Sequence, residues 1–173
     1  APGLAQGAAF WVDASAIVHS ADSLEPKIDL SEALALASSQ LVELMERIEE
    51  EEAEILEFQL AMLEDEALSD PVRQAVAAGT TLIEAWQQTL DEHVTDYEQS
   101  EDEYFQARAS DLRDIRDRVL RILRGETEAE IPEGAILLAT DLTPSRFLSL
   151  DWNKGGGVVL REGSPSSHVA MLA

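Results

Sequence analysis

A histidine that follows a loop of small residues is the side chain in this sequence best suited to covalent chemistry. His168 comes after a stretch of Gly, Ser and Pro and before an apolar segment without a helix breaker. Ser166 or Ser167 is a suitable helix N-cap, which would place His168 in the first helical turn. Unpaired backbone N–H groups and the helix dipole favour an anion there. The pattern fits a phosphoryl group carried on a ring nitrogen, although a lone histidine near a helix start is more often a cap or a surface residue.

Histidine is an apt residue for phosphoryl transfer. A neutral imidazole is nucleophilic near neutral pH, and its N-linked phosphate stays reactive enough to be passed on, whereas a serine phosphate would be too stable. Small loop residues such as Gly163 leave room for a donor or acceptor to approach in line. The other histidines, His19 and His93, have no neighbouring carboxylate constellation or metal-ligand spacing. We expect both to be structural or exposed, and we expect no metal site.

Composition narrows the class of partner. The 173 residues carry a net charge of −23, which disfavours nucleic acid and anionic membranes and favours a basic protein partner. Acidic helices are also simply well solvated, so charge by itself leaves both interpretations open. Cysteine is absent, a basic leader is not evident, and no apolar run is long enough to cross a bilayer. We therefore expect a soluble, cytoplasmic protein.

The central part of the chain has the pattern of a helical bundle. Asp29 with Glu32 resembles a capping box, and no Gly or Pro follows until after about Glu66. Apolar residues recur there every seven positions, which predicts a long amphipathic helix, bent or split, that packs on another helix. These apolar residues are Leu34, Leu41, Ile48, Ile55 and Met62. The opposite face is acidic, and such a face is more often solvated surface than a binding site.

Two further helix signals follow. A Ser-Asp-Pro sequence ending at Pro71 predicts a stop and a restart, with Pro71 in the first position of a short helix. Thr81 with Glu84 is a second capping box, and the apolar helical pattern after it continues to Gly125. Arginines and aspartates are interleaved between residues 108 and 124, a spacing that suits ion pairs within a helix.

Strand-like segments lie at both ends of the chain. The apolar segments 8–12, 135–139 and 158–160 predict short strands, the last two of the fully buried type. Thr143 and Pro144 predict the N-cap and the first residue of a short helix between them.

This order of elements predicts a discontinuous fold of class α+β/α. An α/β domain made of residues 1–23 and 126–173 would be interrupted by an inserted α-helical bundle of residues 24–125. The helix carrying His168 would follow the last strand.

Five segments carry a resemblance to a known family. Residues 163–173 are similar to the signature Gly-Gly-x-Thr-Ser-His followed by a small-apolar helix, with Ser and Pro at positions 164 and 165 in place of the usual Gly and Arg. The other segments are Pro-Gly-Leu-Ala-Gln-Gly at 2–7, Met-Leu-Glu-Asp-Glu at 62–66, Arg-Ala-Ser-Asp-Leu-Arg-Asp-Ile at 108–115 and Asp-Leu-Thr-Pro-Ser at 141–145. In this order they resemble the N-terminal half of enzyme I of the phosphoenolpyruvate:sugar phosphotransferase system.

The resemblance implies a phosphohistidine domain with a helical insertion that binds HPr, a small carrier protein. His168 would take a phosphoryl group from phosphoenolpyruvate and pass it to a histidine on HPr, Thr143 would hold the resting histidine, and Gly163, Ser166 and Ser167 would form the loop. The positions that fall on the HPr-binding helices are Glu50, Glu51, Glu57, Gln59, Asp65 and Arg108. For Arg108, a partner contact and a helix ion pair remain alternatives.

The resemblance places other functions outside this sequence. The phosphoenolpyruvate- and Mg²⁺-binding barrel of the family, which also forms its homodimer, lies C-terminal to the matching half. We expect a fragment that needs no cofactor of its own, ends inside its α/β domain and does not use phosphoenolpyruvate unaided.

Other interpretations remain open. The chain could belong to a multiphosphoryl transfer protein of the dihydroxyacetone kinase type, and the pathway it serves could concern sugar, nitrogen or dihydroxyacetone. The swivelling domain of pyruvate phosphate dikinase is a further relative, against which the long helical insertion argues. From a different class, the chain could be a non-catalytic acidic helical adaptor in which His168 is incidental.

Overall fold

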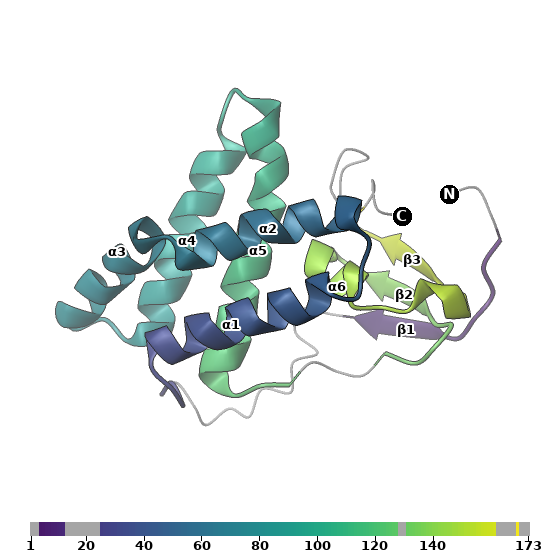
Figure 1. The fold of residues 1–173 in the computed structure, drawn as a ribbon, viewed down its shortest axis with the longest axis horizontal. Coiled ribbons are helices and arrows are strands. Elements are labelled where there is room, and N and C mark those ends of the chain that lie inside the picture. The colour runs from purple at the N-terminus through teal and green to yellow at the C-terminus, as the bar shows by residue number, and fades with distance from the viewer. Residues whose placement is uncertain (1–3, 13–24, 128–130, 162–168, 170–173) are drawn as a thin grey trace.

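The fold consists of a bundle of helices and a small parallel sheet that lie side by side (Figure 1). The computed structural model describes residues 4–12, 25–127, 131–161 and 169, without the side chains of residues 50–52. None of the described helices is long and apolar enough to cross a membrane. This mostly helical architecture with one parallel sheet confirms the predicted fold class.

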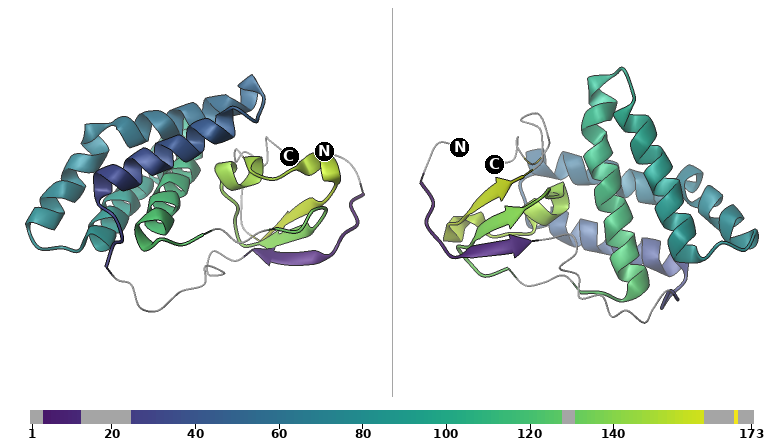
Figure 2. Two further views of the ribbon diagram at one scale, coloured as in Figure 1. Left: turned by 60° about the horizontal axis from the view of Figure 1, so that its bottom comes forward. Right: turned by 180° about the vertical axis from the view of Figure 1, so that it is seen from behind.

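The sheet joins segments from the two ends of the chain. Its strands are β1 (Ala9–Val12), β2 (Ile136–Ala139) and β3 (Gly157–Leu160), in that spatial order and all parallel. Among the described residues, five helices separate β1 from β2 in the sequence, yet the two strands are paired (Figure 2). The helices are therefore an insertion between two adjacent strands. The residue bounds given above for the two domains stay a prediction.

The two faces of the sheet differ. Leu137 and Ala139 of β2 are buried on one face. On the other face, Trp11, Leu138 and Val159 share a register position, and Trp11 and Val159 are 53% and 55% exposed. The prediction that the third strand is fully buried was wrong for Val159. A continuous apolar run is typical of a strand with other elements packed on both faces of its sheet. The run by itself does not show whether both faces are packed.

The predicted long helix is split into α1 (Leu30–Met45) and α2 (Glu50–Glu64). Asp29 caps α1, and its Oδ1 accepts from Glu32 N at 2.9 Å, as the capping-box pattern predicted. In α1 and the connection the heptad positions mark the buried side, since Leu41 is fully buried and Ile48 packs against the core. In α2 the buried leucines are Leu56 and Leu63, one residue after the predicted positions.

Helix α3 (Glu66–Ala77) corrects one prediction, because Pro71 lies inside it. The helix begins at its N-cap Asp65, whose Oδ1 accepts from Ala67 N at 2.8 Å. An acidic cap is as strong a start signal as a proline, and here it starts the helix before the proline. Pro71 has no backbone N–H, so α3 lacks one hydrogen bond at this position, but the helix continues past it.

Helices α4 (Leu82–Glu98) and α5 (Glu103–Arg124) form a hairpin where the apolar pattern predicted continuous helix. Thr81 caps α4, with Oγ1 accepting from Glu84 N at 3.3 Å, and Asp102 caps α5 after the break. Gly125 ends α5 in the left-handed conformation at φ 64°, as predicted. Apolar residues recur at helical spacing on both sides of the turn because both helices pack on the same core.

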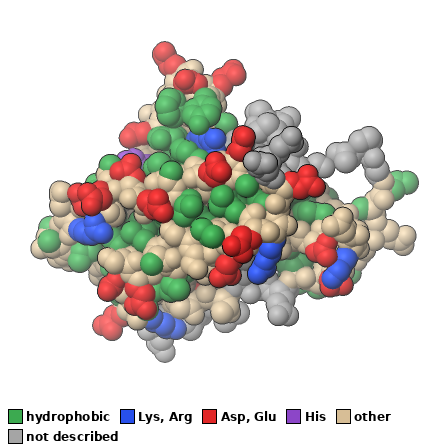
Figure 3. Space-filling view, in the orientation of Figure 1, with side chains coloured by type: hydrophobic (Ala, Val, Ile, Leu, Met, Phe, Trp, Pro, Cys, Tyr) green, Lys and Arg blue, Asp and Glu red, His purple; other side chains and the backbone are tan. Residues whose placement is uncertain are grey.

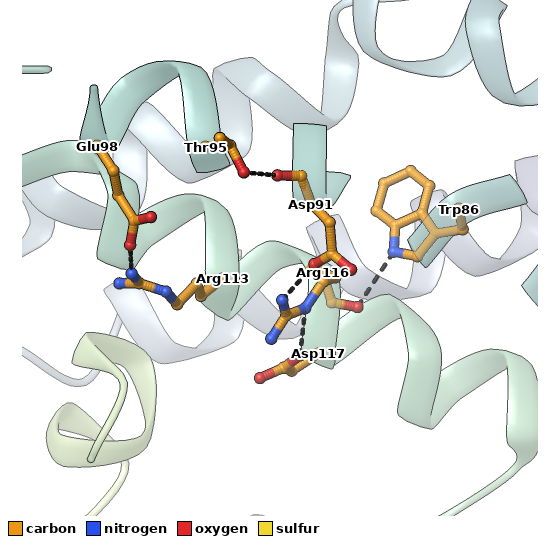
Figure 4. A network of polar contacts seen from close by, with 7 residues as sticks. All are labelled: Trp86, Asp91, Thr95, Glu98, Arg113, Arg116 and Asp117. Atoms are coloured by element: carbon orange, nitrogen blue, oxygen red, sulfur yellow. Dashed lines mark hydrogen bonds and ion pairs between the residues drawn. The ribbon is translucent and has the colours of Figure 1, made fainter. Parts of the chain in front are cut away.

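Polar contacts join the two helices of the hairpin (Figure 4). Trp86 is fully buried and donates from Nε1 to the backbone oxygen of Arg116 at 3.1 Å. Arg116 Nη1 is 2.5 Å from Asp91 Oδ1, and Arg113 pairs with Glu98. Arg113 and Arg116 therefore bridge to α4. Arg116 Nε also lies 2.8 Å from Asp117 Oδ1, an ion pair within α5 of the kind that the sequence pattern suggested.

Helix α6 (Pro144–Leu148) lies between β2 and β3 in the sequence and contacts both α1 and α5. It starts at the predicted N-cap Thr143 with Pro144 in its first position. Its side chains Phe147 and Leu148 join the same hydrophobic core as α1 to α5. Helix α6 has only 5 residues, but these side chains attach the segment between β2 and β3 to the helical bundle.

Candidate functional site

The proposed phosphate-carrying residue lies outside the described residues. This holds for His168 and for the loop residues Gly163, Ser166 and Ser167. Val169, which follows the histidine in sequence, is 5% exposed and belongs to the main hydrophobic core. The roles assigned to these four residues from the sequence stay predictions.

Thr143, the predicted partner of the resting histidine, is the N-cap of α6. Its backbone is extended, and its carbonyl oxygen accepts from Phe147 N at 3.0 Å, as the first bond of the helix. Its side chain makes no capping hydrogen bond. The Thr143 hydroxyl is therefore not used to start the helix that it precedes.

A buried carboxylate on α5 receives the first N–H group of α6 instead. Asp114 is fully buried, and its Oδ2 accepts from Ser145 N at 2.8 Å and from Gln59 Nε2 at 3.1 Å. Its Oδ1 accepts from Ser145 Oγ at 2.7 Å. Both oxygens are thereby satisfied, as burial of a carboxylate requires.

Arg118 extends this network to α1. Its Nη2 donates to Ser145 Oγ at 2.7 Å, and its Nη1 donates to Gln40 Oε1 at 2.8 Å. We call Gln40, Gln59, Asp114, Arg118 and Ser145 the junction network, since they come from α1, α2, α5 and α6. This network was not predicted from the sequence. The available signals were the i, i+4 spacing of Asp114 and Arg118 and the serine of the Thr-Pro-Ser segment.

A cavity of about 1500 Å³ lies beside the junction network, between the helical bundle and the segment that follows α6. Gln40, Arg118 and Ser145 contribute to its wall, together with Leu44 of α1 and Trp152. Trp152 stacks on Phe147 with ring centroids 4.7 Å apart, which fixes this wall against α6.

The predicted partner-binding residues lie in different surroundings. Glu57 of α2 and Asp65, which caps α3, are exposed. Glu50 and Glu51 also belong to α2, but their side chains are not among those that the structure describes. Gln59, in contrast, is fully buried in the junction network and offers no surface to a partner in this conformation.

Arg108 is held inside the helical bundle. Its side chain is 14% exposed, and Nη1 lies 3.1 Å from Oδ2 of the fully buried Asp111. Its guanidinium carbon lies 4.6 Å from the ring centroid of Phe58 and 5.2 Å from that of Tyr104. The helix ion pair that the sequence suggested is therefore present, with cation–π contacts added to it.

The surface around these residues combines acidic and apolar side chains. Figure 3 shows carboxylates spread over the face that carries α1 and α2, with apolar side chains between them and near the tip of the α4–α5 hairpin. Tyr104 and Phe105, at the start of α5, are 56% and 41% exposed. No group of His, Cys, Asp or Glu side chains in the described part of the chain could hold a metal ion.

Comparison with known proteins relates this arrangement to a family. The family described as "PEP-utilising enzyme, N-terminal" matches residues 1–108, and "PEP-utilising enzyme, mobile domain" matches residues 131–173. A phosphoenolpyruvate-protein phosphotransferase of Haemophilus influenzae is 34% identical over 99% of this chain and 32% of its own length. Another, of Haloferax volcanii, is 35% identical over 74% of this chain and 23% of its own length.

Two further comparisons extend the range of relatives. The phosphoryl donor subunit DhaM of a PEP-dependent dihydroxyacetone kinase of Escherichia coli is 39% identical over 61% of this chain and 24% of its own length. The NMR structure of an Enzyme I protein has a TM-score of 0.72 at 24% identity, covering 100% of this chain and 75% of that one.

The chain thus spans about a third or less of the length of these curated relatives. Its matched segments account for both of its structural parts, since residues 1–108 include β1 and most of the helices, and residues 131–173 include β2, α6 and β3. The chain belongs to the PEP-utilising enzyme family, within its enzyme-I-like phosphotransfer members.

Proposed function

We propose that this chain is the phosphohistidine-bearing part of an enzyme-I-like phosphotransferase and that His168 carries the phosphoryl group. The observation that carries the proposal is the match of residues 131–173 to the mobile domain of PEP-utilising enzymes, because this segment contains His168 and its loop. Relatives named phosphoenolpyruvate-protein phosphotransferase support the reaction class.

The proposed reaction has two steps. In the first, a ring nitrogen of His168 attacks the phosphorus of phosphoenolpyruvate, the N–P bond forms, and the bond to the enol oxygen breaks. The enolpyruvate that leaves takes up a proton on carbon to become pyruvate. In the second step a ring nitrogen of a histidine on an HPr-like carrier attacks the same phosphorus, and the N–P bond to His168 breaks. Positioning and electrostatics supply most of the catalysis in such transfers.

Phosphoenolpyruvate and Mg²⁺ are proposed to bind in a domain C-terminal to this chain, through which the full-length protein would also dimerise. In the described residues no acidic cluster has the ligands for a metal, so no step in this chain is assigned to one. We further propose that the parent protein works in the cytoplasm, where a carrier of this kind would meet it.

The helical bundle is proposed to bind the carrier. A chain with net charge −23 attracts a basic surface over long range, and exposed carboxylates such as Glu57 would steer it toward α2. The exposed Tyr104 and Phe105 would supply apolar contact area near the partner. Gln59 is not included, because its side chain is buried.

The test is phosphate uptake from phosphorylated HPr, which needs no phosphoenolpyruvate. We expect acid-labile phosphate on the wild-type chain, none after His168→Ala, and wild-type uptake after His93→Ala, the matched control on α4. Equal uptake by His168→Ala and wild type would contradict the role of His168. A folded wild-type chain that takes up no phosphate would favour the acidic adaptor.

The identity to DhaM supports a second candidate, the enzyme-I-like part of a dihydroxyacetone kinase system. The chemistry at His168 would be the same, but the carrier domain would differ. Measuring transfer rates with HPr and with the HPr-like domain of such a system distinguishes the two, because the cognate carrier should react faster at equal concentration.

A further inference from the structure

We infer that the helical bundle of this chain is adapted to a solvent rich in monovalent cations, because these cations supply the positive charge that its surface lacks. The sequence holds 35 acidic and 12 basic residues, which gives a net charge of −23. Such a charge keeps a protein soluble but destabilises its compact state through self-repulsion. The inference concerns the described helices and does not depend on the role proposed for His168.

The basic side chains of α5 are largely bonded within the protein. Their ion pairs are Arg108–Asp111, Arg113–Glu98, Arg116–Asp91 and Arg116–Asp117. Arg118 is 8% exposed and donates to Gln40 and Ser145. Lysine occurs in the sequence only as Lys27 and Lys154, and Lys154 pairs with Glu133. With 35 acidic residues against 12 basic ones, pairing can neutralise only a minority of the carboxylates.

Like charges lie one turn apart on the exposed faces of the helices. Glu92 and Asp96 of α4 are both exposed, and a spacing of four residues places them on the same face. Neither forms an ion pair with another described residue. On α2, the exposed Glu54 and Glu57 lie three residues apart. Carboxylates at these spacings repel each other and destabilise the helix that carries them.

The C-terminal ends of the helices show the same excess of negative charge. A helix C-terminus carries a partial negative charge that Lys or Arg ordinarily stabilises. The last turns of α1, α2, α3 and α4 contain no basic residue, whereas the last turn of α5 contains Arg121 and Arg124. The exposed Glu46 is the C-cap of α1, and the exposed Glu64 is the last residue of α2. Cations from the solvent can supply the missing charge at these ends.

The range of screening matches the distances between these carboxylates. The Debye length falls from about 10 Å at 0.1 M salt to about 3 Å at 1 M. Side chains three or four residues apart on a helix lie about 5 to 6 Å from each other, so their repulsion persists at the lower salt concentration and is largely screened at the higher one. Screening also weakens the long-range attraction of a basic carrier, so under the proposed function folding and carrier association respond to salt in opposite directions.

The experiment measures amide hydrogen exchange of α4 by mass spectrometry in the full-length parent protein, at low and high KCl concentration. We expect the protection of α4 in the wild type to increase at least about fivefold between about 0.1 M and about 2 M KCl. Glu92→Gln combined with Asp96→Asn removes both charges with little change of shape. This double variant should raise the protection of α4 about twofold to threefold at about 0.1 M KCl and less than about 1.5-fold at about 2 M.

Two controls isolate the effect of charge. The matched control is Glu98→Gln on the same helix, which should bring no gain at low salt because Glu98 already pairs with Arg113. Sucrose strengthens burial without screening charges, so in about 1 M sucrose at low salt the double variant should remain better protected than the wild type. Variant and wild type are always compared in the same solvent, so the effect of the solvent on the intrinsic exchange rate cancels.

Either of two results would overturn the inference. One is equal protection of wild-type α4 at both KCl concentrations, and the other is a gain from the double variant that is absent at low salt or as large at high salt. Both would mean that charge repulsion does not limit the stability of the bundle. Neither result involves phosphate uptake, so the test of His168 stands separately.

Discussion

At the scale of single residues, burial decides which polar side chains are available to a partner at the surface. Gln59 and Arg108 both lie on helices proposed to bind the carrier, but the bundle uses them internally. Gln59 donates to Asp114, and Arg108 pairs with Asp111 beneath the rings of Phe58 and Tyr104. A residue whose polar atoms are bonded inside the bundle contributes to partner binding mainly by holding the neighbouring surface residues in position.

Arg108 allows these two roles to be separated. Arg108→Leu should lower the free energy of unfolding by about 2 to 3 kcal/mol, because it removes a partner of a fully buried carboxylate and two cation–π contacts. Arg73→Leu is the matched control, since Arg73 pairs with Asp70 at the surface and should cost less than about 1 kcal/mol. Urea denaturation measures both. A loss of carrier affinity without a loss of stability would assign Arg108 to the interface instead.

At the scale of elements, the helix boundaries follow from local capping chemistry. Asp29, Asp65, Thr81 and Asp102 each accept from a backbone N–H in the first turn of the helix they precede. Helix α6 differs from these four helices, since the acceptor for its first N–H group comes from another helix. A helix of 5 residues has little stability by itself, so a tertiary contact can determine its start.

Pro71 provides a test at this scale. Pro71→Ala restores a backbone N–H in the interior of α3 and should raise the free energy of unfolding by about 1 to 3 kcal/mol. Pro144→Ala is the control, because proline in the first helical position gives up no hydrogen bond and the gain should be near zero. Thermal denaturation compares them. No gain from Pro71→Ala would mean that α3 is already bent to accommodate the ring.

At the scale of the whole molecule, the helical bundle of an acidic chain shares one hydrophobic core with α6 and with residues of β3. The junction network ties α6 to α1, α2 and α5, and Phe147 and Leu148 bring α6 into the shared core. The helices that are proposed to bind the carrier and the segment that contains Thr143 are therefore parts of one packed structure. Their separation in sequence gives no indication of this.

The net charge predicts how carrier binding depends on salt. Association with a basic HPr-like carrier should slow at least tenfold between about 50 and 500 mM salt, because screening shortens the reach of the acidic surface. Glu57→Lys on α2 should slow association at low salt more than Glu92→Lys, which makes the same charge change on α4. Stopped-flow kinetics measures both. Equal effects of the two substitutions would place the docking surface elsewhere.

The sequence by itself determined the helical insertion between strand-forming ends, the starts of α1 and α4, the end of α5 at Gly125 and the family. These follow from signals that act over a few residues, such as hydrophobic periodicity, side-chain caps and the φ that only glycine adopts freely. The sequence also indicated that Thr143 is the N-cap of α6.

Only the tertiary structure decided which polar side chains are buried. Asp114 and Ser145 are 31 positions apart and Gln59 and Asp114 are 55 apart, and no local pattern links such residues. The same holds for the breaks before α2 and α5, because the helices on the two sides of each break pack on one core and so carry the same kind of apolar pattern. Burial depends on which elements meet, and the free energy that holds Asp114 at the start of α6 comes from contacts between segments distant in the chain.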